Sequence, residues 1–216
     1  MSSRIARVSW FAALLLTAST TVAVAQPVPG FIEEFAGTSL GGFTGGSPLS
    51  NPGTGGFLGA GDGYLKLTNT AVANFGSNSS LSPAFAGNYL LAGVDEIRVS
   101  MNDVGADEVL EMHLAIGNGG NFWQYNTGFA PPNGSWGVYI VPLNGPAGWT
   151  QIGGLPNTFT DALQNADRIL LRHDLAPYIA TPNQIRADVG VDHIELRSSV
   201  TPTAPTSWGR IKSLYR

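Results

Sequence analysis

One aromatic and amide-rich segment, residues 118–129, has side chains suited to binding sugars. Phe122, Trp123 and Tyr125 are interspersed with side-chain amides, among them Asn126, and two glycines precede them. Sugars offer their C–H faces to aromatic rings and their hydroxyls to amides. If the segment is a loop between strands, Phe122, Trp123, Tyr125 and Asn126 form a candidate ligand-binding platform. The alternative is that Trp123 and Trp136 close the ends of the hydrophobic core of the sandwich.

Motifs for catalysis are weak in this chain. It has no cysteine and no His-Glu-x-x-His zinc motif. Glu108 and Glu111 are expected on opposite faces of a strand, where they cannot easily flank one glycosidic bond. His113, His173 and His193 are far apart in the sequence and form a zinc site only if the fold gathers them. A secreted glycan-active hydrolase is therefore the third hypothesis, after two non-catalytic ones.

Composition and charge exclude several other classes of protein. The chain has 216 residues, of which 12% are charged, against roughly 25% in an average soluble domain. Its 28 glycines and 14 prolines are scattered, which excludes collagen, a coiled coil and a helical bundle. The net charge of −4 provides no basic surface for nucleic acid. Without cysteine there is neither a disulfide framework nor a thiolate metal site.

The first 25 residues have the organisation of a secretory signal peptide. Arg4 and Arg7 precede the apolar run WFAALLL, and residues 23–25 (AVA) form a small-residue cleavage site before Gln26. The apolar run is too short to span a membrane, and no second long apolar stretch follows. We expect an exported protein, secreted or held at the cell surface, with no transmembrane segment after cleavage.

The pattern of apolar residues predicts an all-β fold, an antiparallel β-sandwich of jelly-roll type. The clearest strand is 109–116, whose even-numbered residues face the core while its odd-numbered residues face a wetter side. Residues 136–143 contain Pro142, which favours a sheet edge or a strand end. The other strands are expected at 31–35, 63–68, 71–75, 89–91, 95–101, 149–152, 168–173 and 190–197.

Helix is expected in two short segments only. Residues 158–166 form one helical turn that Thr158 or Thr160 can cap. Residues 26–198 then make up the sandwich domain, and residues 199–207, rich in Pro, Ser and Thr, form a linker. Residues 208–216 form a basic amphipathic helical tail, which is either a recognition or anchoring signal or a helix packed on the domain.

Short motifs along residues 30–198 resemble those of bacterial exported jelly-roll domains. They are Glu33-Glu34-Phe35 with Leu40-Gly41-Gly42-Phe43, Gly61-Asp62-Gly63-Tyr64-Leu65, and Val191-Asp192-His193-Ile194. The chain looks like the laminin-B (domain IV)-like group within the galactose-binding-like, carbohydrate-binding-module type of sandwich. His193 departs from this group's Asn or Asp, and the C-terminal tail departs from its Pro-Glu-Pro sorting ending.

The resemblance implies that the first and last strands lie side by side and that their acidic residues bind a structural calcium ion. The residues in question are Glu33, Glu34 and Asp192, with Asp188 as a further candidate. Calcium takes about six to eight oxygen ligands, from carboxylates and backbone carbonyls. The alternative is that both glutamates are solvated and that Asp192 caps a turn.

Together these features predict an exported non-catalytic module that binds a polysaccharide or an extracellular-matrix glycan and is stabilised by calcium. The alternative is a structural or adhesive cell-surface protein with no small-molecule ligand.

Overall fold

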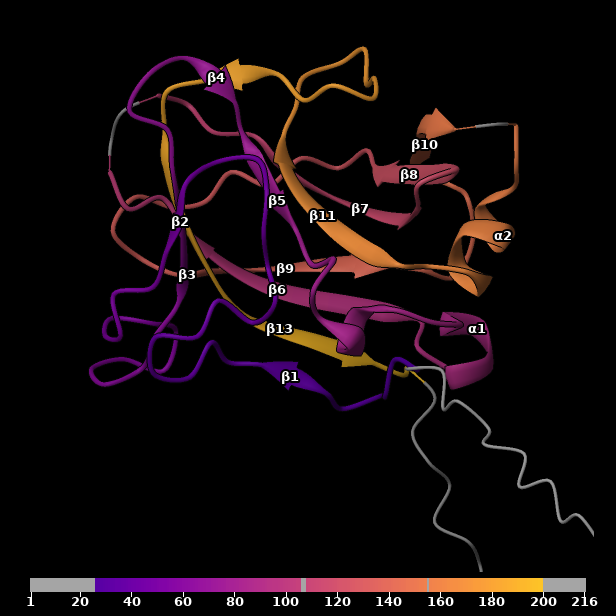
Figure 1. Cartoon of the computed structure of the whole chain (residues 1–216), viewed down its shortest axis with the longest axis horizontal. Coiled ribbons are helices and arrows are strands. Elements are labelled where there is room, and N and C mark those ends of the chain that lie inside the picture. The colour runs from indigo at the N-terminus through magenta and orange to yellow at the C-terminus, as the bar shows by residue number, and fades with distance from the viewer. Residues whose placement is uncertain (1–25, 106–107, 155, 200–216) are drawn as a thin grey trace, which may run out of the picture.

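Two antiparallel β-sheets stacked face to face form the protein in a computed structural model, which describes residues 26–105, 108–154 and 156–199 (Figure 1). Sheet A has the strand order β2-β3-β13-β6-β9, and β1 pairs with β13. Sheet B has the order β10-β8-β7-β11-β5, and β12 pairs with β4 beside the sheets.

Sheet A consists of β1 (Ile32–Glu33), β2 (Leu49–Ser50), β3 (Leu65–Thr68), β6 (Glu96–Asn102), β9 (Gly137–Pro142) and β13 (Asp188–Arg197). The remaining strands are β4 (Ala73–Asn74), β5 (Gly76–Asn78), β7 (Met112–Asn118), β8 (Asn121–Tyr125), β10 (Trp149–Gly154), β11 (Arg168–His173) and β12 (Gln184–Ile185).

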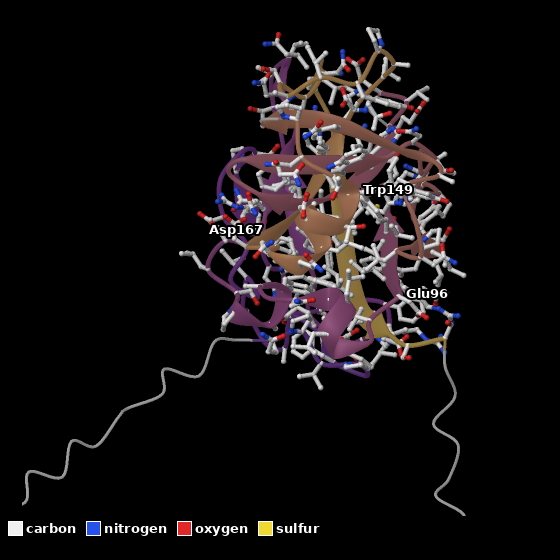
Figure 2. All side chains as sticks on the ribbon, turned by 90° about the vertical axis from the view of Figure 1, so that its right-hand side faces the viewer. Glu96, Trp149 and Asp167 are labelled. Atoms are coloured by element: carbon white, nitrogen blue, oxygen red, sulfur yellow. The ribbon has the colours of Figure 1, made fainter. Side chains whose placement is uncertain are left out.

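The predicted fold class is confirmed. The first and last strands do lie side by side, since Ile32 pairs with Glu195 and Glu33 with Ile194. Strand β9, which ends at Pro142, lies at the edge of sheet A as predicted. The even-numbered residues of 110–116 are all buried in the core between the sheets. Figure 2 looks at the end of the sandwich that carries the helices, where Trp149 marks sheet B and Glu96 marks sheet A.

Two predictions of local structure were wrong. Residues 89–91 are not a strand: they belong to helix α1 (Tyr89–Ala92), because Asn88 accepts a hydrogen bond from the Leu91 amide and Gly93 closes the helix at φ 73°. The segment 118–129 is not simply a loop, since it contains strand β8.

The expected helix near residue 158 is present as α2 (Phe159–Gln164), in which Thr158 and Asp161 form a reciprocal capping box. A single turn of 3-10 helix, η1 (Pro83–Phe85), was not expected. None of the helices within the described ranges is long and apolar enough to cross a membrane. The predicted signal peptide, all of the predicted linker except Ser199, and the predicted basic tail lie outside the described residues.

The connection from β11 to β12 positions the candidate site. Residues 175–183, here called the strap, leave the end of β11 and pass over the outer face of sheet B (Figure 1, top). The ideal Cβ position of Gly153 in β10 lies 3.8 Å from the Ala180 Cβ, so the strap reaches the far edge of the sheet.

Candidate functional site

Side chains in strand β8 alternate between the two faces of sheet B. Trp123 and Tyr125 pack against the core, where their rings lie 5.7 Å from Phe159 and 5.4 Å from Trp149, respectively. Phe122 and Gln124 have the opposite orientation and lie on the outer face. The four predicted platform residues therefore do not share one surface. The alternative interpretation, that Trp123 and Trp136 close the core, holds for Trp123, whereas Trp136 is not part of that core and packs beside Phe57 and Tyr64.

Strand register places one row of outward-facing side chains across all of sheet B. Gln124 pairs with Thr150 of β10 on one side and with Ala115 of β7 on the other. Ala115 in turn pairs with Leu170 of β11, and Leu170 pairs with Asn78 of β5. The adjacent row contains Phe122, Gly117 and Arg168. Because Gly117 has no side chain, the Arg168 guanidinium carbon lies 5.7 Å from the centre of the Phe122 ring.

Four polar side chains of this face are buried beneath or beside the strap. They belong to His113, Gln124, Arg172 and Asp174, none more than 3% exposed. The odd-numbered face of β7 was predicted to be the wetter one. That prediction was wrong, because His113 and Ala115 are both fully buried, and the Tyr178 ring of the strap lies 5.1 Å from His113.

Arg172 and Asp174 form a buried ion pair. Arg172 Nη2 lies 2.8 Å from Asp174 Oδ2, and both side chains are almost completely inaccessible to solvent. Burial lowers the pKa of the Arg172 guanidinium, and the negative charge of Asp174 opposes that shift. The same guanidinium donates to two strap carbonyls, those of Ile179 at 2.7 Å and Ala180 at 3.1 Å.

Several buried polar atoms of this face lack a hydrogen-bonding partner among the described residues. They are Gln124 Oε1 and Nε2, Asn126 Oδ1, Arg172 Nε and Asp174 Oδ1. Leaving a buried amide unpaired costs about 1 to 3 kcal/mol, so most buried polar groups in native proteins are paired. Sheet A also has such atoms, in Ser100, Asn102 and Asp188, but those on the outer face of sheet B belong to neighbouring side chains. This group of neighbouring side chains could pair with a polar ligand.

A cavity of about 150 Å³ opens beside the strap on the same face. Leu170 and Arg172 of β11, Asn78 of β5, and Ala180 and Pro182 of the strap are among its lining residues. Arg172 thus belongs both to the lining of the cavity and to the buried polar cluster. Farther along the face, Phe122 presents a half-buried aromatic ring.

The predicted calcium ligands Glu33, Glu34 and Asp192 each interact with different partners. Glu33 Oε1 accepts a hydrogen bond from the Phe35 amide at 3.0 Å, and burial raises the pKa of Glu33. Glu34 pairs with His193 Nδ1 at 3.0 Å. Within the described ranges, no group of three or more His, Asp or Glu side chains is arranged to hold a metal ion. The trio Glu33, Glu34 and Asp192 does not form one ligand set here, and calcium binding itself stays a prediction.

Asp192 has a different acidic neighbour, Asp62. Its two carboxylate oxygens accept from the amides of Phe57 and His193, both at 2.7 Å. An ideal Cβ at Gly56 would lie within 2.7 Å of three oxygens, Asp62 Oδ2, Asp192 Oδ2 and the Gly63 carbonyl, so only glycine leaves room for them. Burial, reinforced by the Asp62 charge, raises the pKa of Asp192 to about 7. Asp188, the further candidate, pairs instead with Lys66 at 2.8 Å.

The histidines are not gathered into a zinc site. His113 and His173 lie on neighbouring strands of sheet B, whereas His193 lies in a bulge of β13 in sheet A. His113 Nδ1 lies 2.8 Å from the Tyr125 carbonyl oxygen, and its Nε2 lies 3.2 Å from Glu111. Burial lowers the pKa of His173, whose Nδ1 accepts from the Glu111 amide at 3.2 Å.

Sequence reasoning missed Gln124, Arg172 and Asp174 as site residues. The sequence RILLRHD (168–174) did contain a signal for Arg172 and Asp174. Both follow the apolar run ILL and occupy alternate positions on the outward side of the strand. Gln124 could be assigned to the same face only once β8 was known to be a strand.

Solved structures similar to this chain are known, although no protein-family model and no curated protein matches it. One is the family 11 carbohydrate-binding module from Clostridium thermocellum in complex with a β-1,3-1,4-mixed-linked tetrasaccharide. The match has a TM-score of 0.53 and 19% identity, and covers 80% of this chain and 98% of that one. Another is an exo-β-agarase, with a TM-score of 0.55, 16% identity, and coverage of 80% of this chain but 25% of the enzyme. The chain therefore has the jelly-roll fold of carbohydrate-binding modules, as its motifs predicted.

Proposed function

We propose that the chain is an exported, non-catalytic module that binds a polysaccharide or matrix glycan on the outer face of sheet B. The observation that carries the proposal is the set of buried polar atoms on this face that lack partners, with both amide atoms of Gln124 among them. A sheet surface with no ligand to meet would gain stability from apolar residues at these positions. The clostridial module of the same fold, solved with a tetrasaccharide, supports the choice of glycan.

The chemistry of the face suits a neutral, hydroxyl-rich ligand. Phe122 can stack on the C–H face of a sugar ring. Gln124 and Asn126 can donate to or accept from hydroxyls, and the Arg172–Asp174 pair supplies a fixed donor next to a fixed acceptor. The two charges cancel, and the chain as a whole carries a formal charge of −4, which disfavours a polyanionic glycan.

Retention on a panel of soluble and insoluble polysaccharides tests the proposed function. We expect the mature protein to be retarded in affinity gels that contain at least one neutral member of the panel. Each gel is run in calcium and in chelator, so that a calcium effect on binding is seen separately. If the protein is retained by no polysaccharide, glycan binding is wrong and a structural or adhesive role becomes the better interpretation.

Neighbouring residues of β8 provide a test of which face binds. Phe122→Ala is expected to weaken glycan retention at least tenfold and to leave the melting temperature nearly unchanged, because its ring lies on the outer face. Trp123→Ala is expected to lower the free energy of unfolding by about 2 kcal/mol or more, because it removes core contacts. Affinity gels and urea denaturation of both variants provide the measurement. Lost retention in Trp123→Ala alone, at intact stability, would move the site to the surface hollow that Trp123 lines together with Thr158 and Phe159.

Gln124→Met is expected to stabilise the protein while it abolishes binding. Methionine has a similar shape but no polar atoms, so it removes two buried groups that lack partners. We expect the free energy of unfolding to rise by about 1 kcal/mol and glycan retention to fall. A destabilised Gln124→Met variant would mean that the amide is paired in the folded protein.

We keep a structural calcium ion in the proposal, but at Asp192 and Asp62 only. Of the predicted ligands, Asp192 has a second carboxylate beside it, that of Asp62. A proton shared by this pair relieves the repulsion of two adjacent negative charges, and a calcium ion would relieve it in the same way.

A further inference from the structure

The strap has little apolar contact with the sheet that it covers. All nine of its residues are described, and none is buried. Leu175 and Ile179, its two large aliphatic residues, are 48% and 58% exposed. A segment that buries so little apolar surface opens at a low free-energy cost compared with the strands beneath it.

A few polar contacts hold the strap down. Arg172 donates to the carbonyls of Ile179 and Ala180, and the Tyr178 hydroxyl donates to the Asn126 carbonyl at 3.0 Å. The Leu175 amide donates to Asn183 Oδ1 at 2.8 Å, which ties the two ends of the strap together. A loop closed on itself in this way can move as one unit, and its opening breaks three hydrogen bonds to sheet B.

The groups that the strap covers are better suited to a ligand than to the strap. Arg172 gives two donors to the strap but keeps Nε unpaired, and Gln124 gains no hydrogen bond from it. The closed arrangement therefore leaves buried polar atoms unpaired. A hydroxyl-rich ligand could pair with them, and its hydroxyls could also replace the two strap carbonyls at Arg172.

We propose that the strap is a gate over the glycan site, closed in the free protein and displaced when a polysaccharide chain occupies the face of sheet B. This inference rests on the proposed function, and it adds that the position of the strap regulates access of the glycan to its site. The apparent affinity is the intrinsic affinity multiplied by the fraction of molecules whose strap is open, so anything that favours the open strap strengthens binding.

A designed disulfide tests the gate directly. The ideal Cβ of Gly153 lies 3.8 Å from the Ala180 Cβ, a distance that suits a disulfide, and the chain has no cysteine of its own. In Gly153→Cys/Ala180→Cys, the oxidised form holds the strap on β10 and the reduced form releases it. We expect oxidation to lower retention on the polysaccharide that binds the wild type at least tenfold, and reduction to restore it. The two single-cysteine variants, treated identically, control for the substitutions and for the reductant.

The outcomes separate the gate from the function. Retention of the reduced form with loss in the oxidised form supports the gate. Equal retention of both forms, with the disulfide confirmed by mass spectrometry, overturns the gate and leaves glycan binding intact. No retention of the wild type on any polysaccharide overturns both.

Tyr178→Phe provides a second test that does not depend on disulfide formation. It removes the hydrogen bond to the Asn126 carbonyl but keeps the ring beside His113. A gate that opens more easily binds more tightly, so we expect retention to rise about two- to tenfold. Weaker retention would mean that the hydroxyl contacts the glycan and that the strap is part of the binding surface, which contradicts the gate.

Discussion

Replacement of Arg172 by alanine is expected to lower the free energy of unfolding by about 3 to 5 kcal/mol. Arg172 is 3% exposed, and its partner Asp174 is 0% exposed. Without the guanidinium, the Asp174 carboxylate is left buried with no opposite charge, and two strap carbonyls lose their donor. Urea denaturation, followed by tryptophan fluorescence, measures the loss.

The same strand provides a matched control. Arg168 lies four residues earlier on the same face of β11 and pairs with Asp167, but both side chains are partly exposed, at 31% and 43%. Arg168→Ala is expected to cost less than about 1 kcal/mol. Similar losses in the two variants would contradict the view that burial of the charge determines the effect. Addition of Asp174→Ala to Arg172→Ala is expected to recover part of the stability, because it removes the unpaired charge.

The alternation of residues was sufficient to predict most of the sandwich. Residues 168–173 form β11 as expected, and the inward side of β7 matches the predicted apolar positions. The prediction of a strand at residues 89–91 was wrong because a four-residue helix depends on its two caps, Asn88 and Gly93, more than on the apolar pattern between them. β8 was taken for a loop because flanking glycines and amides obscured its alternation.

The candidate site was less predictable because it depends on contacts between distant segments. Nothing in the sequence near His113 shows that residue 178 covers it. From the sequence alone, Arg172 and Asp174 are expected to be solvent-exposed residues at the end of a strand. Only the position of the strap in the fold shows that they are buried. Two residues of the predicted platform, Phe122 and Asn126, do lie on the outer face of sheet B. Trp123 lies on the inner face because successive side chains of a strand point to opposite faces.

The stability of the calcium-free protein is expected to fall as the pH rises from about 4 to about 8. The pKa of Asp192 is about 7 in the folded protein against an ordinary 3.8, so between these values the folded state holds a proton that the unfolded state has lost. The contribution is therefore complete below about pH 4 and is lost as the pH rises through 7. One pKa unit corresponds to about 1.4 kcal/mol, so a shift of about three units amounts to a loss on the order of 4 kcal/mol. Urea denaturation in chelator at a series of pH values measures it.

Asp192→Asn is expected to remove this pH dependence, whatever it costs in absolute stability, because it removes the titrating carboxyl. Asp188→Asn is the control, since Asp188 lies in the same strand but pairs with Lys66. It should leave the slope in place. An unchanged slope in Asp192→Asn would mean that another group titrates.

Calcium distinguishes a proton from a metal ion between Asp62 and Asp192. If the pair binds calcium, millimolar calcium should restore stability at pH 8 in the wild type and not in Asp192→Asn, since a bound ion replaces the proton that is lost. If calcium leaves the wild-type slope unchanged, the structural-calcium prediction for Asp192 is wrong. The pair then acts only through its shared proton, and its contribution makes the protein more stable at acidic than at neutral pH.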